Sequence, residues 1–270
     1  MANLATSPDT PAEGEVRLEL RESRATGRVA WLTLAREAKL NTLTPGLMRG
    51  FIAQVEALAA DPLLRAVVVT GAGPKAFVGG ADITVMAGLQ DGDQARAFIT
   101  LVHGCCDVLR RLPVPVIGRV NGYCLGAGLE LAAACDLRIA ADSAKFGMPE
   151  VRVGIPSVVE AALLPGLIGW GRTRRLLLLA ETLDAATMAE WGFLERVVPA
   201  GQLDAAVEEW LALLGKAGPQ AIRNQKALIR AWEDLPLAQA VQAGIPAFAA
   251  SWNTPEPVTM LGSFAKGRKQ

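Results

Sequence analysis

Hydrophobic and polar residues alternate along two segments near the start of the chain. The segments 16–23 and 27–35 both repeat with a period of two, and Thr26-Gly27 lies between them. A period of two is typical of strands that are buried on one face, and glycine favours the tight turn that joins such strands. We therefore predict a β-hairpin over these residues.

Apolar residues spaced three and four apart predict two long helices. The first begins at Thr44-Pro45, a capping residue followed by a first-turn proline, and ends near Asp61. The second covers 91–112 and is ended by Pro113. Continuous apolar runs predict buried strands at 65–73, 115–122 and 135–141, with a short apolar helix at 125–135.

Two of these strands run into glycine-containing turns and lie 49 residues apart, counted from Val67 to Val116 (116 − 67). This recurrence favours stacked ββα units over a Rossmann sheet. The turn at 67–73, VVVTGAG, lacks the third glycine of a dinucleotide-binding fingerprint, and Pro74 interrupts the helix that should meet a pyrophosphate. We therefore do not predict a dinucleotide site there.

From residue 155 onward the pattern is almost wholly helical, apart from one short strand near 194–199. The last helices are predicted at 202–215, 219–231, 236–250 and 256–266. We expect an α/β protein with a flexible polar tail at 1–14, a core at 15–200 and a C-terminal helical region at 201–270.

Composition excludes several classes of protein. The 270 residues include 51% apolar residues, and 27 Lys and Arg balance 27 Asp and Glu. Disordered chains are less apolar and usually more charged, and nucleic-acid binders usually carry a basic surplus. No apolar run is long enough to cross a membrane, and no secretory signal is visible. Four cysteines without CxxC spacing indicate a reducing cytoplasm and no metal site, and the low charge content favours an oligomer.

Glu130 is the most anomalous residue, because it is the only charge between Arg119 and Asp136 and lies in the apolar segment LGAGLELAAAC (125–135). A buried carboxylate is costly unless it has a partner or a function, although a Glu here could also reach solvent or pair with an arginine. Glu150 follows Pro149 in an extended segment and could face Glu130 across a cleft. Two carboxylates in a dry pocket can divide acid and base roles.

Two glycine-rich turns could supply backbone donors to an oxyanion. One contains Gly79-Gly80, and the other opens the short helix at 125–131. Amides at a helix start lack intrahelical acceptors, and two such amides facing each other would form an oxyanion hole. The only histidine, His103, lies on the long amphipathic helix, and we interpret it as a packing residue. Since no GxSxG elbow accompanies it, serine and cysteine hydrolases are disfavoured.

Five segments together resemble the enoyl-CoA hydratase/isomerase (crotonase) family, in the family's order and spacing over residues 16–269. They are AKLNTL (38–43), GAGPKAFVGGADI (71–83), PVIGRVNGYCLGAGLELAAACDLRIAA (115–141), AKFGMPEVRVGIP (144–156) and FAKGRK (264–269). The resemblance implies a crotonase-like spiral of ββα units whose C-terminal helices form trimers, often paired into hexamers. It also implies that an acyl-CoA thioester is the substrate, with no separate cofactor and no metal.

By the same resemblance, Glu130 activates water for attack at Cβ, Glu150 exchanges the proton at Cα, and the backbone N–H groups of Ala81 and Ala127 hold the thioester oxygen. The further positions that it assigns to binding CoA or the substrate are Ala38, Lys39, Leu40, Gly80, Asp82, Ile83, Thr84, Gly126, Ser157 and Glu160. Hydration of a 2-enoyl-CoA to a 3-hydroxyacyl-CoA, or its reversal, is the expected reaction.

Three positions depart from the family pattern. Ala127 replaces a common glycine, Thr84 stands where many hydratases carry lysine, and the segment 157–160 replaces a run of glycines. The bulkier segment should reshape the acyl pocket, and its Glu160 is either a third pocket carboxylate or a helix-surface residue. An enoyl-CoA isomerase, or another reaction of the family, therefore stays an alternative. Some relatives bind RNA through a lysine-rich helix, but the helix at 46–61 has one Arg and no Lys, which disfavours RNA binding.

Overall fold

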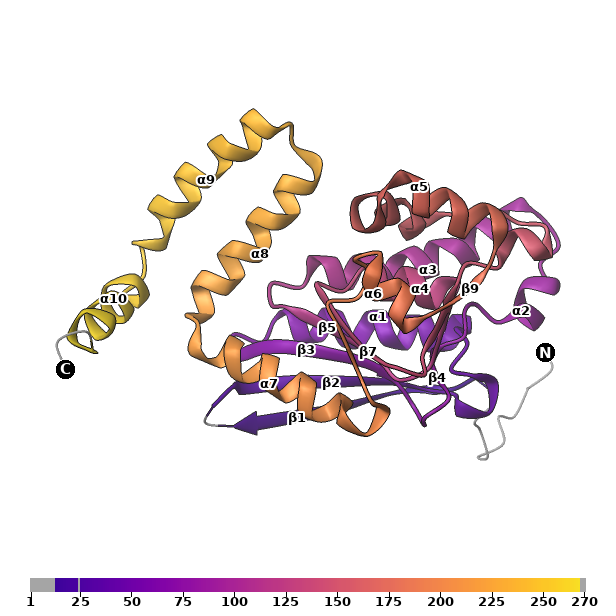
Figure 1. Cartoon of the computed structure of the whole chain (residues 1–270), viewed down its shortest axis with the longest axis horizontal. Coiled ribbons are helices and arrows are strands. Elements are labelled where there is room, and N and C mark those ends of the chain that lie inside the picture. The colour runs from indigo at the N-terminus through magenta and orange to yellow at the C-terminus, as the bar shows by residue number, and fades with distance from the viewer. Residues whose placement is uncertain (1–12, 24, 268–270) are drawn as a thin grey trace, which may run out of the picture.

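The computed structural model describes residues 13–23 and 25–267, so most of the tail predicted at 1–14 lies outside the described residues. The predicted hairpin is confirmed, since β1 (Glu15–Ser23) pairs antiparallel with β2 (Gly27–Ala35) from end to end. Figure 1 shows this hairpin at one edge of the larger sheet.

The larger sheet has six strands in the order β1-β2-β3-β5-β7-β10. Its later strands are β3 (Leu64–Gly71), β5 (Val116–Val120), β7 (Leu137–Ala141) and β10 (Arg196–Val198). All run parallel to β2 and are largely buried, which explains their continuous apolar sequences. Val67 pairs with Val116, so the 49-residue recurrence corresponds to neighbouring strands in register.

A second sheet of four short strands was not predicted. Its strands, in spatial order, are β4 (Ala76–Val78), β6 (Tyr123–Leu125), β8 (Lys145–Gly147) and β9 (Thr182–Asp184). The chain places one strand in the large sheet and the next in the small sheet three times in succession, as β3–β4, β5–β6 and β7–β8. This alternation produces the predicted stack of ββα units.

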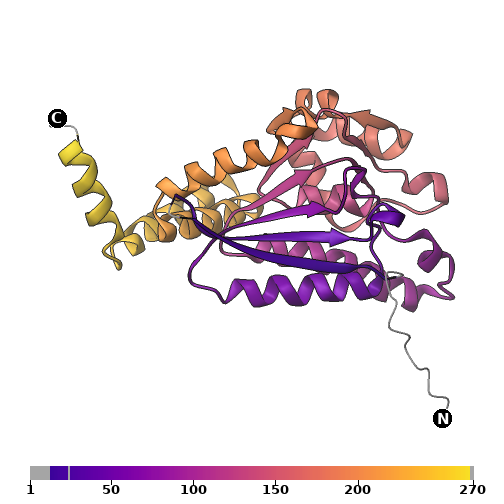
Figure 2. The same cartoon turned by 90° about the horizontal axis from the view of Figure 1, so that it is seen from below.

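A first group of helices precedes residue 217. They are α1 (Pro45–Ala59), α2 (Ile83–Ala87), α3 (Gly92–Arg111), α4 (Ala127–Ala133), α5 (Leu164–Leu179), α6 (Ala185–Glu190) and α7 (Leu203–Lys216). Helix α1 lies along one face of the sheet and α7 along the other (Figure 2). As predicted, Thr44 caps α1, where its hydroxyl accepts a hydrogen bond from the Leu47 amide at 3.2 Å.

Four short 3-10 turns complete the core: η1 (Glu37–Lys39), η2 (Glu150–Val153), η3 (Val159–Leu163) and η4 (Ala200–Gln202). The C-terminal helices α8 (Pro219–Asp234), α9 (Leu237–Ser251) and α10 (Glu256–Gly267) match the predicted ones closely. In Figure 1, α9 and α10 extend away from the body of the protein as an arm. No helix among the described residues is both long and apolar enough to span a bilayer.

Candidate active site

Glu130 lies in the middle of α4, a helix whose seven residues are all buried. The Glu130 residue is only 4% exposed. This burial raises the pKa of Glu130 to about 8, and the neighbouring charges of Glu150 and Glu160 act in the same direction. Backbone hydrogen bonds from Ala161 and Val158 oppose the shift. The carboxyl group therefore faces the turn η3, and the alternatives of a solvent-reaching or arginine-paired Glu130 are excluded.

Glu150 is the first residue of η2 and is half-buried beside the start of α4. A Cβ atom built on Gly126 would lie 2.5 Å from Glu150 Oε1, so the carboxylate rests directly against that glycine. The other oxygen, Oε2, accepts a hydrogen bond of 2.8 Å from the Ser157 hydroxyl. Burial raises the pKa of Glu150, while its own backbone amide and Ser157 lower it. The structure thus brings the two predicted carboxylates into one electrostatically coupled site.

The backbone N–H groups of Ala81 and Ala127 both lie on loops that meet at this site. Ala81 forms an isolated parallel bridge with Leu43, in which Leu43 N donates to Gly80 O at 2.9 Å and Asp82 N donates to Leu43 O at 3.0 Å. In a parallel bridge of this kind the N–H of Ala81 points away from Leu43. Ala127 is the first residue of α4, where amides have no intrahelical acceptor. Among the described residues, neither amide has a hydrogen-bond acceptor.

Two glycines with positive φ allow these loops to touch. Gly80 has φ 108° and Gly126 has φ 51°, conformations that disfavour side chains. A Cβ atom on Gly126 would be 4.0 Å from Gly80 Cα, so the loop before Ala81 contacts the loop before Ala127. Two free donors on touching loops have the composition of an oxyanion hole.

The predicted CoA-binding residues occupy the rim next to these amides. Ala38 and Lys39 are exposed on η1, as is Leu40, the residue that follows it, and Leu40 O accepts a hydrogen bond of 2.8 Å from Gly79 N. That bond ties η1 to the glycine loop that precedes Ala81.

The first residues of α2 continue the same rim. Ile83 and Thr84 are exposed, whereas Asp82 is buried. The Asp82 carboxylate caps α2 by accepting from Val85 N at 3.0 Å, and it also pairs with Arg36. The Asp82 side chain therefore serves the local fold, as do its backbone groups, which bond to Leu43 O and to Met86 N.

A third carboxylate lies behind the first two. Glu160 is 5% exposed, which excludes the helix-surface interpretation, and its charge adds to the raised pKa of Glu130. Glu160 Oε1 lies 2.8 Å from His103 Nδ1, and the His103 side chain is 51% exposed. The interpretation of His103 as a packing residue is therefore wrong: it joins Glu160 to the surface. The sequence signal for this pair was weak, because the two residues are 57 positions apart.

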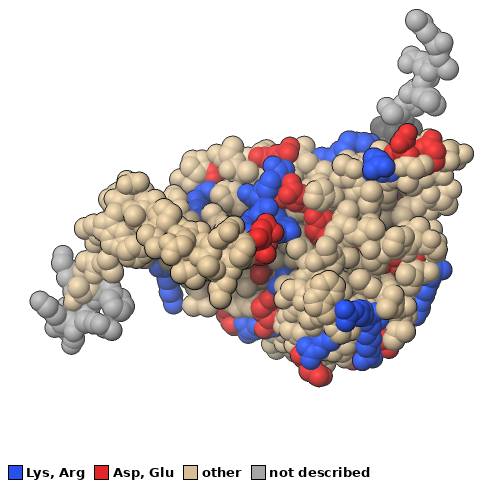
Figure 3. All heavy atoms as spheres, turned by 90° about the horizontal axis from the view of Figure 1, so that it is seen from above, with Lys and Arg blue, Asp and Glu red and all other residues tan. Residues whose placement is uncertain are grey.

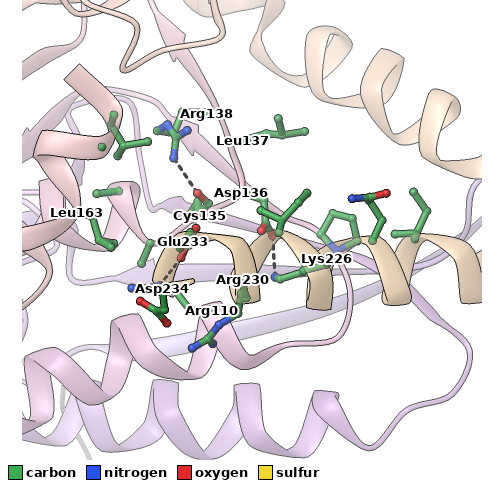
Figure 4. Close-up of a pocket in the computed structure, with 18 of the residues that line it drawn as sticks. Arg110, Cys135, Asp136, Leu137, Arg138, Leu163, Lys226, Arg230, Glu233 and Asp234 are labelled. Carbon is green, nitrogen blue, oxygen red and sulfur yellow. Dashed lines mark hydrogen bonds and ion pairs between the residues drawn. The ribbon is translucent and has the colours of Figure 1, made fainter. Parts of the chain in front are cut away.

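A cavity of about 840 Å³ lies elsewhere, beside α8. Figure 4 shows that Lys226 and Asp136 form an ion pair in its wall, with Nζ and Oδ2 2.7 Å apart. Lys226 Nζ also donates to the carbonyl oxygens of Leu109 and Val114. These bonds connect α8 to the core, and neither Glu130 nor Glu150 lines this cavity.

Comparisons with known proteins bear on the family and the fold of the chain. A family model described as enoyl-CoA hydratase/isomerase matches residues 24–269. The chain is 32% identical over 243 residues to the crotonyl-CoA hydratase of Syntrophomonas wolfei, covering 90% of this chain and 93% of the relative. It is 31% identical over 244 residues to the short-chain-enoyl-CoA hydratase of Clostridium acetobutylicum, with 90% and 93% covered. A solved structure of enoyl-CoA hydratase from Bacillus anthracis matches with a TM-score of 0.87 and 31% identity, covering 93% of this chain and 96% of that one.

Proposed function

The chain belongs to the enoyl-CoA hydratase/isomerase family, and on that premise we propose that it adds water to a 2-enoyl-CoA to form a 3-hydroxyacyl-CoA, and catalyses the reverse dehydration. The observation that carries this proposal is the pair Glu130 and Glu150, coupled electrostatically and adjacent to the free amide of Ala127. A hydratase needs one base for water and one acid for Cα, and this site holds both.

The proposed reaction follows from these positions. Glu130 takes a proton from water as the oxygen attacks Cβ, and Glu150 delivers a proton to Cα. Negative charge develops on the thioester oxygen between these events. The N–H groups of Ala81 and Ala127 stabilise that charge, a contribution of about 2.7–4 kcal/mol for each such donor. The 3-hydroxyacyl-CoA then leaves Glu130 protonated and Glu150 ionised.

The CoA part of the substrate is proposed to lie along the rim formed by η1 and the start of α2. Support comes from the exposure of Ala38, Lys39, Leu40 and Thr84 and from the bond that joins η1 to the glycine loop. Lys39 supplies the positive charge for a CoA phosphate, since the chain as a whole has zero net charge. CoA arrives as part of the substrate, and no further cofactor is part of the proposal.

A homotrimer, or a dimer of trimers, is proposed as the assembly. Apolar side chains are exposed on the arm formed by α9 and α10, among them Leu237 at 81% and Phe248 at 69%. Figure 3 shows this arm as a surface with almost no charged residues. A large exposed apolar surface marks a protein contact. A cytoplasmic location is proposed because all four cysteines are free and buried.

The test uses crotonyl-CoA and follows the loss of ultraviolet absorbance of the conjugated thioester. We expect the wild-type protein to hydrate this substrate, and Glu130→Gln and Glu150→Gln each to abolish hydration while the CoA ester still binds. If wild-type protein hydrates no short 2-enoyl-CoA, the proposal is wrong. Conversion of a 3-enoyl-CoA to its conjugated isomer without hydration would identify an isomerase instead.

A further inference from the structure

We infer that Glu160 and His103 form a proton exit that returns Glu130 to its ionised state after each hydration, by passing a proton from the buried carboxyl group to solvent. The inference rests on the proposed hydration and assigns a role to two side chains that the reaction at the substrate does not use. Both would act on the reaction through Glu130 and so are positioning residues for its proton.

The need for an exit follows from the proton balance. Each hydration transfers one proton from water to Glu130 and one proton from Glu150 to Cα, so the next turnover needs Glu130 ionised and Glu150 protonated. Glu150 is half-buried and regains its proton from the solvent side. Glu130 is only 4% exposed, so a chain of side chains that ends at the surface would give its proton a route to solvent that does not pass through the substrate pocket.

Glu160, in the turn that Glu130 faces, provides an acceptor for the Glu130 proton. Backbone hydrogen bonds to Glu130 come from Val158 and Ala161, the residues that flank Val159 and Glu160 in η3. Glu160 Oε2 is buried and has no hydrogen-bond partner among the described residues. A buried carboxylate oxygen without a donor is costly, and a proton arriving from Glu130 would satisfy it.

The second half of the path is the hydrogen bond between Glu160 Oε1 and His103 Nδ1, at 2.8 Å. Because about half of the His103 side chain is exposed, the imidazole connects the buried carboxylate to water. The O–H bond of Glu130 breaks as an O–H bond forms on Glu160. An O–H bond of Glu160 then breaks as an N–H bond forms on His103, and water or buffer takes a proton from the imidazolium. No electrons are transferred, because each step moves only a proton.

The other titratable groups around Glu160 do not offer this route. Cys105 and Cys106 on α3 are buried, and burial raises the pKa of the Cys105 thiol to about 12 and that of Cys106 well above its usual value. Both thiols therefore stay protonated and cannot accept a proton at neutral pH. Among these described groups that interact with Glu160, His103 is the one whose side chain reaches solvent.

The backbone before Glu160 supports a specialised role for this turn. Val159 has φ 37°, a left-handed conformation that is rare for a β-branched residue. Such a conformation is energetically unfavourable and persists where the surroundings require it. The strain is compatible with a turn that holds Glu160 between Glu130 and His103 rather than with an ordinary connection.

The test compares His103→Ala with the wild-type protein in dilute buffer. Under multiple turnover we expect kcat for hydration to fall by about 10²-fold, the low end for a positioned acid–base group, because proton release becomes limiting. In a single turnover with enzyme in excess, the rate should stay close to that of the wild type. Added imidazole should restore kcat of His103→Ala, because it can replace the exposed side chain.

Glu160→Gln should also lower kcat, but imidazole should not restore it, since an amide cannot carry the proton inside the protein. Thr100→Ala, an exposed substitution one turn earlier on α3, should leave kcat unchanged. A His103→Ala enzyme with wild-type kcat in dilute buffer, or with a loss that imidazole does not restore, would overturn the inference alone. A wild-type protein without any hydration would overturn the proposed function and this inference with it.

Discussion

The buried carboxylate of Glu130 should lower the free energy of unfolding of the protein. The size of this effect can be worked out from the surroundings of the side chain. The substitution Glu130→Gln keeps nearly the same volume and removes the ionisable group from α4. In the folded protein, burial and the charge of Glu150 raise the pKa of Glu130 from 4.5 to about 8. In the unfolded chain, water surrounds the carboxyl group and its pKa is ordinary.

The shift of about 3.5 pH units is equivalent to up to about 5 kcal/mol, at about 1.36 kcal/mol per unit. A raised pKa means that the folded protein binds the proton more tightly than the unfolded chain. The free energy of unfolding therefore falls as the pH rises from 4.5 to about 8. Glu130→Gln removes this loss, so its advantage over the wild type should be small below pH 4.5 and largest above about 8.

Urea unfolding at several pH values and at one protein concentration measures this advantage. Glu56→Gln is the matched control, because the side chain of Glu56 is 58% exposed on the surface of α1 and its charge is solvated in both states. The reasoning would be refuted if the difference in unfolding free energy between Glu130→Gln and the wild type did not grow between these pH values, or if Glu56→Gln showed the same growth.

Three further predictions concern activity. Hydration needs one proton shared between Glu130 and Glu150, so kcat/KM should fall above about pH 8, where that proton is lost. A kcat/KM profile that still rises above this pH would contradict the electrostatic coupling of the two carboxyl groups. Ala127→Pro should keep α4, since the first helical position tolerates proline, yet lower kcat by about 10²–10³ by removing one amide donor; circular dichroism and steady-state kinetics test both parts. Ser157→Ala should move the acidic limb of the kcat/KM profile to higher pH, because Ser157 lowers the pKa of Glu150; an unmoved limb would show that this bond is unimportant.

The fold was predictable wherever a segment is long enough for burial to produce a clear repeat of hydrophobic residues. The hairpin at 15–35, the helices α1 and α3 and the four C-terminal helices follow from local patterns, and the structure confirms them. The pairing of Val67 with Val116 shows that even the repeat of the spiral was visible in the sequence. The resemblance to the enoyl-CoA hydratase/isomerase family is likewise confirmed by the match over 24–269 and by the similarity to a solved hydratase.

The small sheet was not predictable, because each of its strands has only three residues. Such strands are too short to show a period, and their pairing depends on tertiary contacts. The same limit applies to His103 and Glu160, whose contact joins α3 to η3 across 57 positions. Local sequence showed one histidine on an amphipathic helix, and no local pattern could indicate that a buried carboxylate lies opposite it.

The positions of the two proposed oxyanion donors, Ala81 and Ala127, depend on one close contact between α4 and β4. A Cβ atom on Gly128 would lie 2.1 Å from the Val78 carbonyl oxygen, so only glycine lets α4 approach β4 this closely. Strand β4 leads directly into the loop of Ala81, and Gly128 directly follows Ala127. The contact that requires glycine therefore also sets the separation of the two amides. In the proposed reaction, the first residues of α4 therefore have distinct roles: Ala127 is the proposed donor, Gly128 allows the close approach to β4, and Glu130 is the proposed base.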